Sequence, residues 1–260
     1  MKKTFIFIIS IIMTIFLLIL TGCSDNSKNT TNTKKNNTTS NTAKKQEQTI
    51  DYEVAAEKQM SKPENGDTIA IIKVKNFGDI KVKFFEDIAP KAVENFITHS
   101  KNGYYNNLIF HRIINEFMIQ GGDPTGTGAG GESIWGKGFG TELDKSLVPY
   151  RGSLCMAMSS LPNSIGSQFF ITQAHYSEEN ESILKRMGNY PKGLLEQYKK
   201  HGGYLSLYQN YTVFGQVFEG MEVVDKIAQV QTETTPEGQE DKPIQDVVIE
   251  TIEVTTYQSN

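Results

Sequence analysis

The sequence of 260 residues predicts a mainly β domain, folded as an antiparallel barrel or sandwich with two helices. Three observations predict this class. Short β-branched and aromatic runs recur from residue 68 onward, and glycine-containing turns separate them. Outside one polar block, only two segments of this body have the apolar periodicity of a helix.

The first two strands form a predicted hairpin. Thr68–Lys75 and Asp79–Phe85 are β-branched runs on either side of Asn76-Phe77-Gly78, which has turn composition. Runs of the same kind predict further strands at Leu108–Ile114, Phe117–Gln120, Leu154–Met158, Gln168–Thr172, Thr212–Phe218 and Asp246–Val254.

Two helices are predicted between these strands. Pro90–Ser100 has proline in its first turn, an apolar stripe, and Gly103 just past its end. Met221–Val230 is the second predicted helix. A polar block with helical composition, at about 177–206, interrupts the strand pattern, so we interpret it as an insertion between two strands.

The N-terminus resembles a bacterial lipoprotein signal. Two lysines precede an apolar run from Phe5 to Leu20, which is shorter than the ~20 residues that span a bilayer. The run ends in Leu20-Thr21-Gly22-Cys23, where the resemblance implies cleavage and lipidation of Cys23. An uncleaved membrane anchor is the alternative. Both interpretations predict an exported domain held to the membrane by its N-terminus.

Composition predicts the domain boundaries. Residues 1–22 are the expected signal peptide, and residues 23–62 hold Cys23, a disordered Asn/Thr/Lys-rich tether and a short helix. Residues 63–260 form the expected folded domain, and the chain from residue 49 onward has a formal net charge near −9. This acidic balance argues against nucleic-acid binding. If Cys23 is lipidated, Cys155 has no disulfide partner, so we interpret it as a buried apolar residue.

The motifs argue against two kinds of cofactor. Gly126–Gly131 has the GxGxxG spacing of a dinucleotide site, but three more glycines follow within nine residues. The helix that such a site requires is therefore not expected. The four histidines lack metal-ligand spacing, and no cysteine pair accompanies them. We expect neither a metal nor another cofactor.

Arg112 lies inside the apolar stretch FHRIINEFMIQGGD. A buried guanidinium without a partner is costly, so Arg112 must face solvent, pair with an acid or serve a groove. Strand alternation puts Met118 and Gln120 on one face, and it pairs Gln168 with Phe170 in the same way. Such a surface is either a binding site or ordinary core with edge-strand glutamines.

Four stretches together resemble the cyclophilin family of peptidyl-prolyl cis–trans isomerases: FHRIINEFMIQGGD, GTGAGGESIW, RGSLCMAMSSLPNSIGSQFFIT and YTVFGQVFEGMEVVDKI. They occur in the family's order, and the resemblance covers residues 67–254 apart from the insertion. It implies a closed eight-stranded antiparallel β-barrel capped by two α-helices, with a substrate groove on the outside of the barrel.

The resemblance also assigns site residues. Arg112 would be the catalytic arginine. The residues that would bind the substrate are Phe117, Met118, Phe170 and Leu207 around the proline ring, Gln120 and Gln168 on its backbone, and Gly128, Ala157, Met158, Ser159 and Tyr211 along the groove.

Two departures from the family pattern have consequences. Many relatives have tryptophan and histidine where this chain has Ser206 and Tyr211, and tyrosine can replace histidine as an aromatic wall. The lost tryptophan is expected to affect binding of the drug ciclosporin more than catalysis. The loop Ser159–Ile165 is one residue longer than in compact family members.

The expected function is isomerisation of X-Pro bonds in exported polypeptides that fold at the outer face of a bacterial cytoplasmic membrane. The expected partners are proline-containing polypeptides and, through the lipid anchor, the membrane. We expect a monomer. The alternative is a proline-binding chaperone or adaptor with little turnover, which would act through the insertion.

Overall fold

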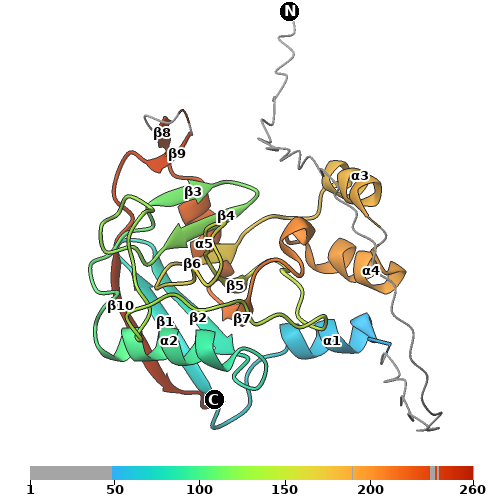
Figure 1. The fold of residues 1–260 in the computed structure, drawn as a ribbon, viewed down its shortest axis with the longest axis horizontal. Helices are drawn as coiled ribbons and strands as arrows, with labels where there is room; N and C mark the ends of the chain where they lie inside the picture. Colours follow the sequence, from blue (N-terminus) through green and yellow to red (C-terminus); the bar gives the residue numbers. More distant parts are fainter. Residues whose placement is uncertain (1–48, 189, 235–237, 239, 260) are drawn as a thin grey trace, which may run out of the picture. The chain divides into compact units, whose positions relative to one another are not determined.

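The computed structural model describes residues 49–188, 190–234, 238 and 240–259 (Figure 1). The expected signal peptide, Cys23 and the expected tether up to residue 48 lie outside the described residues. Within the described part of the chain, no helix has both the length and the apolar character that crossing a bilayer requires.

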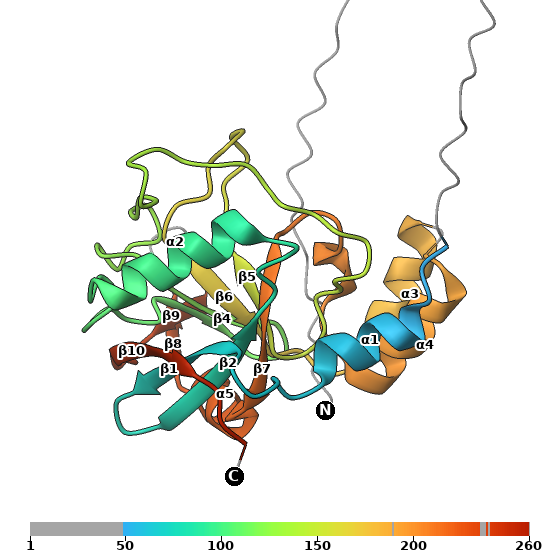
Figure 2. The same ribbon diagram turned by 90° about the horizontal axis from the view of Figure 1, so that it is seen from below.

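One antiparallel sheet of eight strands forms the body of the domain. Its strands, in spatial order, are β10 (Ile249–Thr256), β1 (Thr68–Val74), β2 (Gly78–Phe84), β7 (Val213–Glu219), β5 (Ser153–Met156), β6 (Phe169–Thr172), β4 (Met118–Gly121) and β3 (Arg112–Ile114). The sheet curls into a half-barrel (Figures 1 and 2). The predicted strands are therefore present, most of them with small shifts of their ends.

The barrel is not closed, contrary to the expectation. The edge strands β3 and β10 do not pair with each other. One isolated bridge, between Ile109 and Val248, joins the segments that precede them, and the backbone N–H of Phe110 donates to the carbonyl of Val247. Because residues 108–110 make these contacts instead of extending the pairing with β4, β3 is much shorter than predicted.

Both predicted helices cover the half-barrel. α2 (Pro90–Lys101) and α5 (Met221–Ala228) lie on opposite sides of the curled sheet (Figure 2) and bury their apolar faces in the main core. Phe96 of α2 is fully buried, with its ring centroid 5.2 Å from that of Phe169 and 5.4 Å from that of Phe214. Burying such a side chain contributes about 1.5–3 kcal/mol, so these aromatic contacts hold helix and sheet together.

The start of α2 depends on a residue far away in the sequence. Pro90 occupies the first turn, where its missing N–H is tolerated, but Ala89 provides no side-chain cap. The Glu142 carboxylate instead accepts hydrogen bonds from the backbone N–H groups of Lys91 at 3.1 Å and Ala92 at 2.9 Å. The carboxylate also interacts favourably with the positive end of the helix dipole.

The polar insertion folds as two helices and a 3-10 turn: α3 (Glu178–Met187), α4 (Lys192–His201) and η1 (Leu205–Leu207). The short helix expected near residue 55 is α1 (Tyr52–Met60), and it packs beside α4 (Figure 2). A second apolar core joins α1 and the insertion to a loop of the body, through Ala56, Val148, Tyr150, Leu184, Leu194, Tyr198 and Leu205. The packed unit thus begins at α1, ahead of the expected boundary at residue 63.

The buried amide of Gln59 attaches α1 to the sheet. Its Nε2 donates to the carbonyl of Val148 at 2.7 Å and to Gln216 Oε1 at 3.2 Å. Its Oε1 accepts from the backbone N–H of Val148 at 3.1 Å. Gln59 is 1% exposed, so removal of the amide would leave the buried N–H of Val148 without its acceptor and out of reach of water.

One hairpin, formed by two short strands, was not predicted. β8 (Thr232–Thr234) and β9 (Glu240–Pro243) form a separate two-stranded sheet, and β9 lies against β3 (Figure 1). The segment has the polar composition of a loop and lacks an apolar alternation, so the sequence provided no strand signal there.

Replacing Gln59 with alanine is expected to lower the free energy of unfolding by about 2 kcal/mol, because buried polar groups lose their partners. The urea midpoint, followed by circular dichroism, measures the change. Glu57→Ala, at an exposed position of the same helix, is the matched control and should change stability little. Equal midpoints for both variants would contradict a stabilising role for the amide.

Candidate active site

Strand register brings predicted site residues from three strands into one row. Arg112 on β3 is opposite Gln120 on β4, and Gln120 is opposite Phe170 on β6. Directly opposite residues project from the same face of a sheet. Their neighbours Ile119 and Phe169 belong to the main core, so the row occupies the outer face of the half-barrel.

The Arg112 side chain is both ion-paired and partly open to solvent. Its Nε donates to Asp241 Oδ2 at 2.7 Å, and its Nη1 donates to Gln120 Oε1 at 3.4 Å. The side chain is 34% exposed, whereas the Asp241 side chain is 7% exposed. The guanidinium therefore lies at the outer surface with a carboxylate behind it. Arg112 thus both faces solvent and pairs with an acid, so its charge is not buried without a partner.

A chain of amides continues from Arg112 across the sheet. Gln120 Nε2 donates to Gln168 Oε1 at 2.9 Å. Gln168 Nε2 in turn donates to the carbonyls of Gly128 at 2.9 Å and Gly130 at 2.7 Å. The two predicted glutamines and the predicted Gly128 are thus connected, and the side-chain orientations depend on one another.

The glycine-rich loop is an ordered turn organised by Asp123. This carboxylate accepts from the backbone N–H groups of Thr125 at 2.8 Å, Gly128 at 2.6 Å and Gly130 at 3.2 Å. Burial raises the pKa of Asp123, but these hydrogen bonds to the ionised form outweigh burial and leave the pKa below its ordinary value. A Cβ at Gly130 would lie 2.3 Å from Asp123 Oδ1, so a side chain has no room there.

An apolar cluster lies beside the row. Met118, Phe170 and Leu207 belong to one buried cluster, and the partly buried Phe117 and Tyr211 pack against it. The ring centroids of Phe170 and Tyr211 are 5.6 Å apart in an edge-to-face arrangement. All the residues that the resemblance assigned to the proline ring therefore meet at one place.

The predicted thiol is buried within this apolar cluster. Cys155 is a free cysteine with no exposed surface, and it belongs to the same cluster as Met118 and Phe170. Burial raises the pKa of the Cys155 thiol. A protonated, inaccessible thiol is a poor nucleophile, so its interpretation as an apolar core residue is confirmed.

A hollow of about 290 Å³ adjoins the amides. Its lining includes Gln120, Gly128, Ala157, Met158, Ser159 and Gln168. Met158 is 37% exposed, which leaves an apolar side chain at the rim. The other predicted groove residues, Gly128, Ala157, Met158 and Ser159, thus gather around this hollow.

Phe117 is held from behind by a hydrogen-bonded network. Its carbonyl accepts from the backbone N–H of Gln173 at 2.8 Å. The Gln173 side chain accepts from the backbone N–H of Glu116 at 2.8 Å and donates to Asp225 Oδ1 at 2.9 Å. Burial raises the pKa of Asp225, but hydrogen bonds from Arg151 and Gln173 outweigh it and lower the pKa. This network fixes the backbone at one side of the pocket.

Tyr204 packs against the apolar cluster of Met118, Phe170 and Leu207, and the sequence did not identify it. Its ring centroid lies 4.4 Å from that of Phe117. Tyr204 lies in the insertion, just before η1, whereas Ser206 lies within η1. The insertion therefore supplies an aromatic side chain close to the position where this chain lacks the family's tryptophan. Neither spacing nor motif marked this residue.

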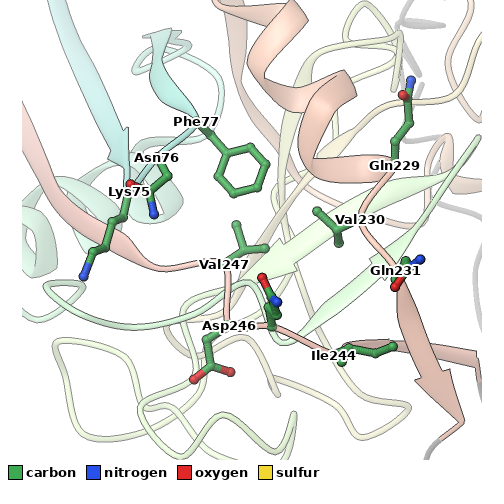
Figure 3. A pocket seen from close by; sticks show the side chains of 10 residues that line it. Lys75, Asn76, Phe77, Gln229, Val230, Gln231, Ile244, Asp246 and Val247 are labelled. Atoms are coloured by element: carbon green, nitrogen blue, oxygen red, sulfur yellow. The ribbon is translucent and has the colours of Figure 1, made fainter.

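A larger hollow, of about 510 Å³, lies elsewhere (Figure 3). It is bordered by Lys75 and Phe77 at the turn between β1 and β2, by Gln229 after α5, and by Ile244 and Asp246 after β9. None of the predicted site residues lines it. Among the described residues, no three His, Cys, Asp or Glu side chains gather in a group that could hold a metal ion.

The curled antiparallel sheet, its two covering helices and the outer groove define a cyclophilin-like fold. Residues 69–254 match the family model described as cyclophilin type peptidyl-prolyl cis-trans isomerase/CLD. The chain therefore belongs to the cyclophilin family. It is a peptidyl-prolyl cis–trans isomerase.

Relatives and solved structures support this assignment. A protein of Staphylococcus saprophyticus, whose name proposes peptidyl-prolyl cis–trans isomerase activity, is 46% identical over 198 residues, which cover 75% of this chain and 96% of the relative. A similarly named Staphylococcus aureus protein is 45% identical over 196 residues, with the same coverage. A Cryptosporidium parvum cyclophilin, solved in the presence of the dipeptide Ala-Pro, has a TM-score of 0.57 and 35% identity, and the match covers 74% of this chain and 99% of that one.

Replacing Tyr204 with alanine is expected to lower kcat/KM on a short proline peptide about three- to tenfold, because an aromatic contact with Phe117 is lost. A protease-coupled isomerisation assay measures the change. Tyr204→Phe keeps the ring and removes only the hydroxyl, so it should retain most of the activity. An alanine variant with unchanged kcat/KM would show that the ring is not a wall of the substrate pocket.

Proposed function

We propose that Arg112 is the catalytic residue of this isomerase. The observation that carries the proposal is a partly exposed guanidinium in the same strand row as Gln120 and Phe170, where Gln120 lines a hollow and Phe170 belongs to an apolar cluster. In this proposal the substrate proline ring occupies the pocket formed by Phe117, Met118, Phe170 and Leu207. Gln120 and Gln168 then bind the substrate backbone, and the neighbouring hollow receives residues that precede the proline.

The chemistry requires a donor and not a nucleophile. Rotation about an X-Pro bond is opposed by a barrier of about 18–20 kcal/mol, because the C–N bond has partial double-bond character. Twisting the bond localises a lone pair on the proline nitrogen. A guanidinium N–H that points at this nitrogen binds the twisted state more strongly than either planar isomer, and this difference accelerates rotation.

Arginine suits this role for two physical reasons. It stays charged at every relevant pH, and its planar group presents five N–H donors in a rigid fork. Asp241 and Gln120 account for two of these donors. The partly exposed side chain therefore has further N–H groups with which to reach a substrate in the groove.

Arg112→Ala is expected to lower kcat/KM on the order of 100-fold, which is typical for removal of a donor that acts in the transition state. The protease-coupled assay on a short proline peptide measures this in the full-length chain, purified in detergent. Arg186→Ala, at an exposed position of α3, is the matched control for removing one arginine. Full activity of the Arg112 variant would reject the proposed mechanism.

We propose further that the enzyme is a lipoprotein, anchored at the extracytoplasmic face of the cell membrane. The charged N-terminus, the short apolar run and the cysteine at position 23 support this proposal. The enzyme would then act on exported polypeptides while they fold. Uncatalysed X-Pro isomerisation takes tens to hundreds of seconds, so it can limit the folding of such chains.

Cys23→Ser is expected to abolish incorporation of labelled palmitate and to leave an uncleaved precursor, when the chain is expressed in a bacterium that processes lipoproteins. Gel mobility and autoradiography of the membrane fraction measure both effects. Cys155→Ser removes the other of the two cysteines and should remain labelled. Equal labelling of the two variants would overturn the lipoprotein proposal.

A further inference from the structure

Asp241 is a carboxylate that the sequence did not connect with the groove. It lies on β9, in the hairpin that packs against β3, and its side chain is 7% exposed. Its Oδ2 accepts from Arg112 Nε at 2.7 Å. Figure 1 shows how the hairpin reaches the edge strand that carries Arg112, although 129 residues separate the two partners in the chain.

This burial is costly unless Arg112 stays in place. A charged carboxylate removed from water requires an opposite charge or several donors. Among the described residues, Arg112 is the only side chain that forms a salt bridge with Asp241. The carboxylate and the guanidinium therefore depend on each other, and the hairpin is coupled to the groove through this pair.

The pair restricts the guanidinium in a particular way. Asp241 accepts from Nε, the nitrogen closest to the backbone, while Gln120 accepts from Nη1 on another part of the planar group. Two acceptors at different nitrogens limit rotation of the plane. A free arginine side chain has considerable rotamer entropy, and a group that is already oriented loses less of it when it binds the twisted substrate.

We propose that Asp241 is the positioning residue for Arg112: it orients the guanidinium so that the remaining N–H donors face the proline nitrogen in the groove. This inference rests on the proposed catalytic role of Arg112. Orientation, and not the electrostatic field, is the contribution of Asp241, because a negative charge at this place partly offsets the positive charge that the reaction uses.

Substitutions in two backgrounds test the inference. Asp241→Ala is expected to lower kcat about tenfold with KM changed less than about twofold, because misoriented catalytic groups affect mainly the transition state. Asp241→Asn keeps an acceptor oxygen, so it should recover most of the lost activity. In the Arg112→Ala background, Asp241→Ala should cause no further loss. The assay uses the full-length chain in detergent and a short proline peptide.

Two controls separate positioning from folding. Glu233→Ala removes the other ion pair of the hairpin, in which Glu233 contacts Lys242 at 3.0 Å, and it should leave activity unchanged. The nuclear magnetic resonance signal of the Arg112 Nε–H group, identified by its absence in Arg112→Ala, reports on the contact directly. It should be sharp and slow to exchange in the parent chain, and broad or lost in Asp241→Ala.

The activities of these variants distinguish a positioning role of Asp241 from a role in folding. Full activity of Asp241→Ala together with an inactive Arg112→Ala variant would overturn the positioning role and leave the proposed function intact. A further loss in the double variant, or a loss of activity in Glu233→Ala, would show that the hairpin acts through folding and would also overturn it. Full activity of Arg112→Ala would instead reject the proposed function itself.

Discussion

The antiparallel register of β3, β4 and β6 is the constraint on which the site depends. It aligns Arg112, Gln120 and Phe170 in one row across three strands. A shift by one residue would exchange every inner side chain for an outer one. The aromatic core around Phe96 makes such a shift costly, because it would bring polar groups into the space now filled by buried rings. Core packing thus determines which face carries the chemistry.

Hydrogen bonds connect the polar side chains along this row. Hydrogen bonds run from Asp241 through Arg112 and Gln120 to Gln168 and the glycine-rich loop. A catalyst that works by orientation benefits from such connections, since rigid donors need no reorganisation when the substrate twists. In the proposed mechanism the apolar cluster around Met118 and Phe170 meets the other requirement, because it would bind the proline ring without competing for these donors.

The insertion and α1 extend the fold on one side of the groove. Beyond their shared apolar core, Tyr204 packs against the cluster that contains Met118 and Phe170, and it contacts Phe117. A segment outside the strand pattern therefore reaches the residues that we propose to bind the proline ring. Gln59 attaches α1 to the same body through a buried amide. In the proposed lipoprotein, the first helix after the tether is α1, which packs on the same domain as the proposed active site. The anchor would therefore hold the catalytic domain directly.

The sequence by itself determined the strand runs and the two covering helices, because each depends on local periodicity. Its resemblance to the cyclophilin family also named the residues that we propose to bind the proline ring, because the family's motifs are contiguous stretches of the chain. The sequence did not determine the open edge between β3 and β10, the β8–β9 hairpin, or the contacts of Tyr204, Gln59 and Asp241. These features join residues far apart in the chain. A carboxylate in a polar loop looks the same in sequence whether it faces water or an arginine, and only the packing of the hairpin against β3 made that choice.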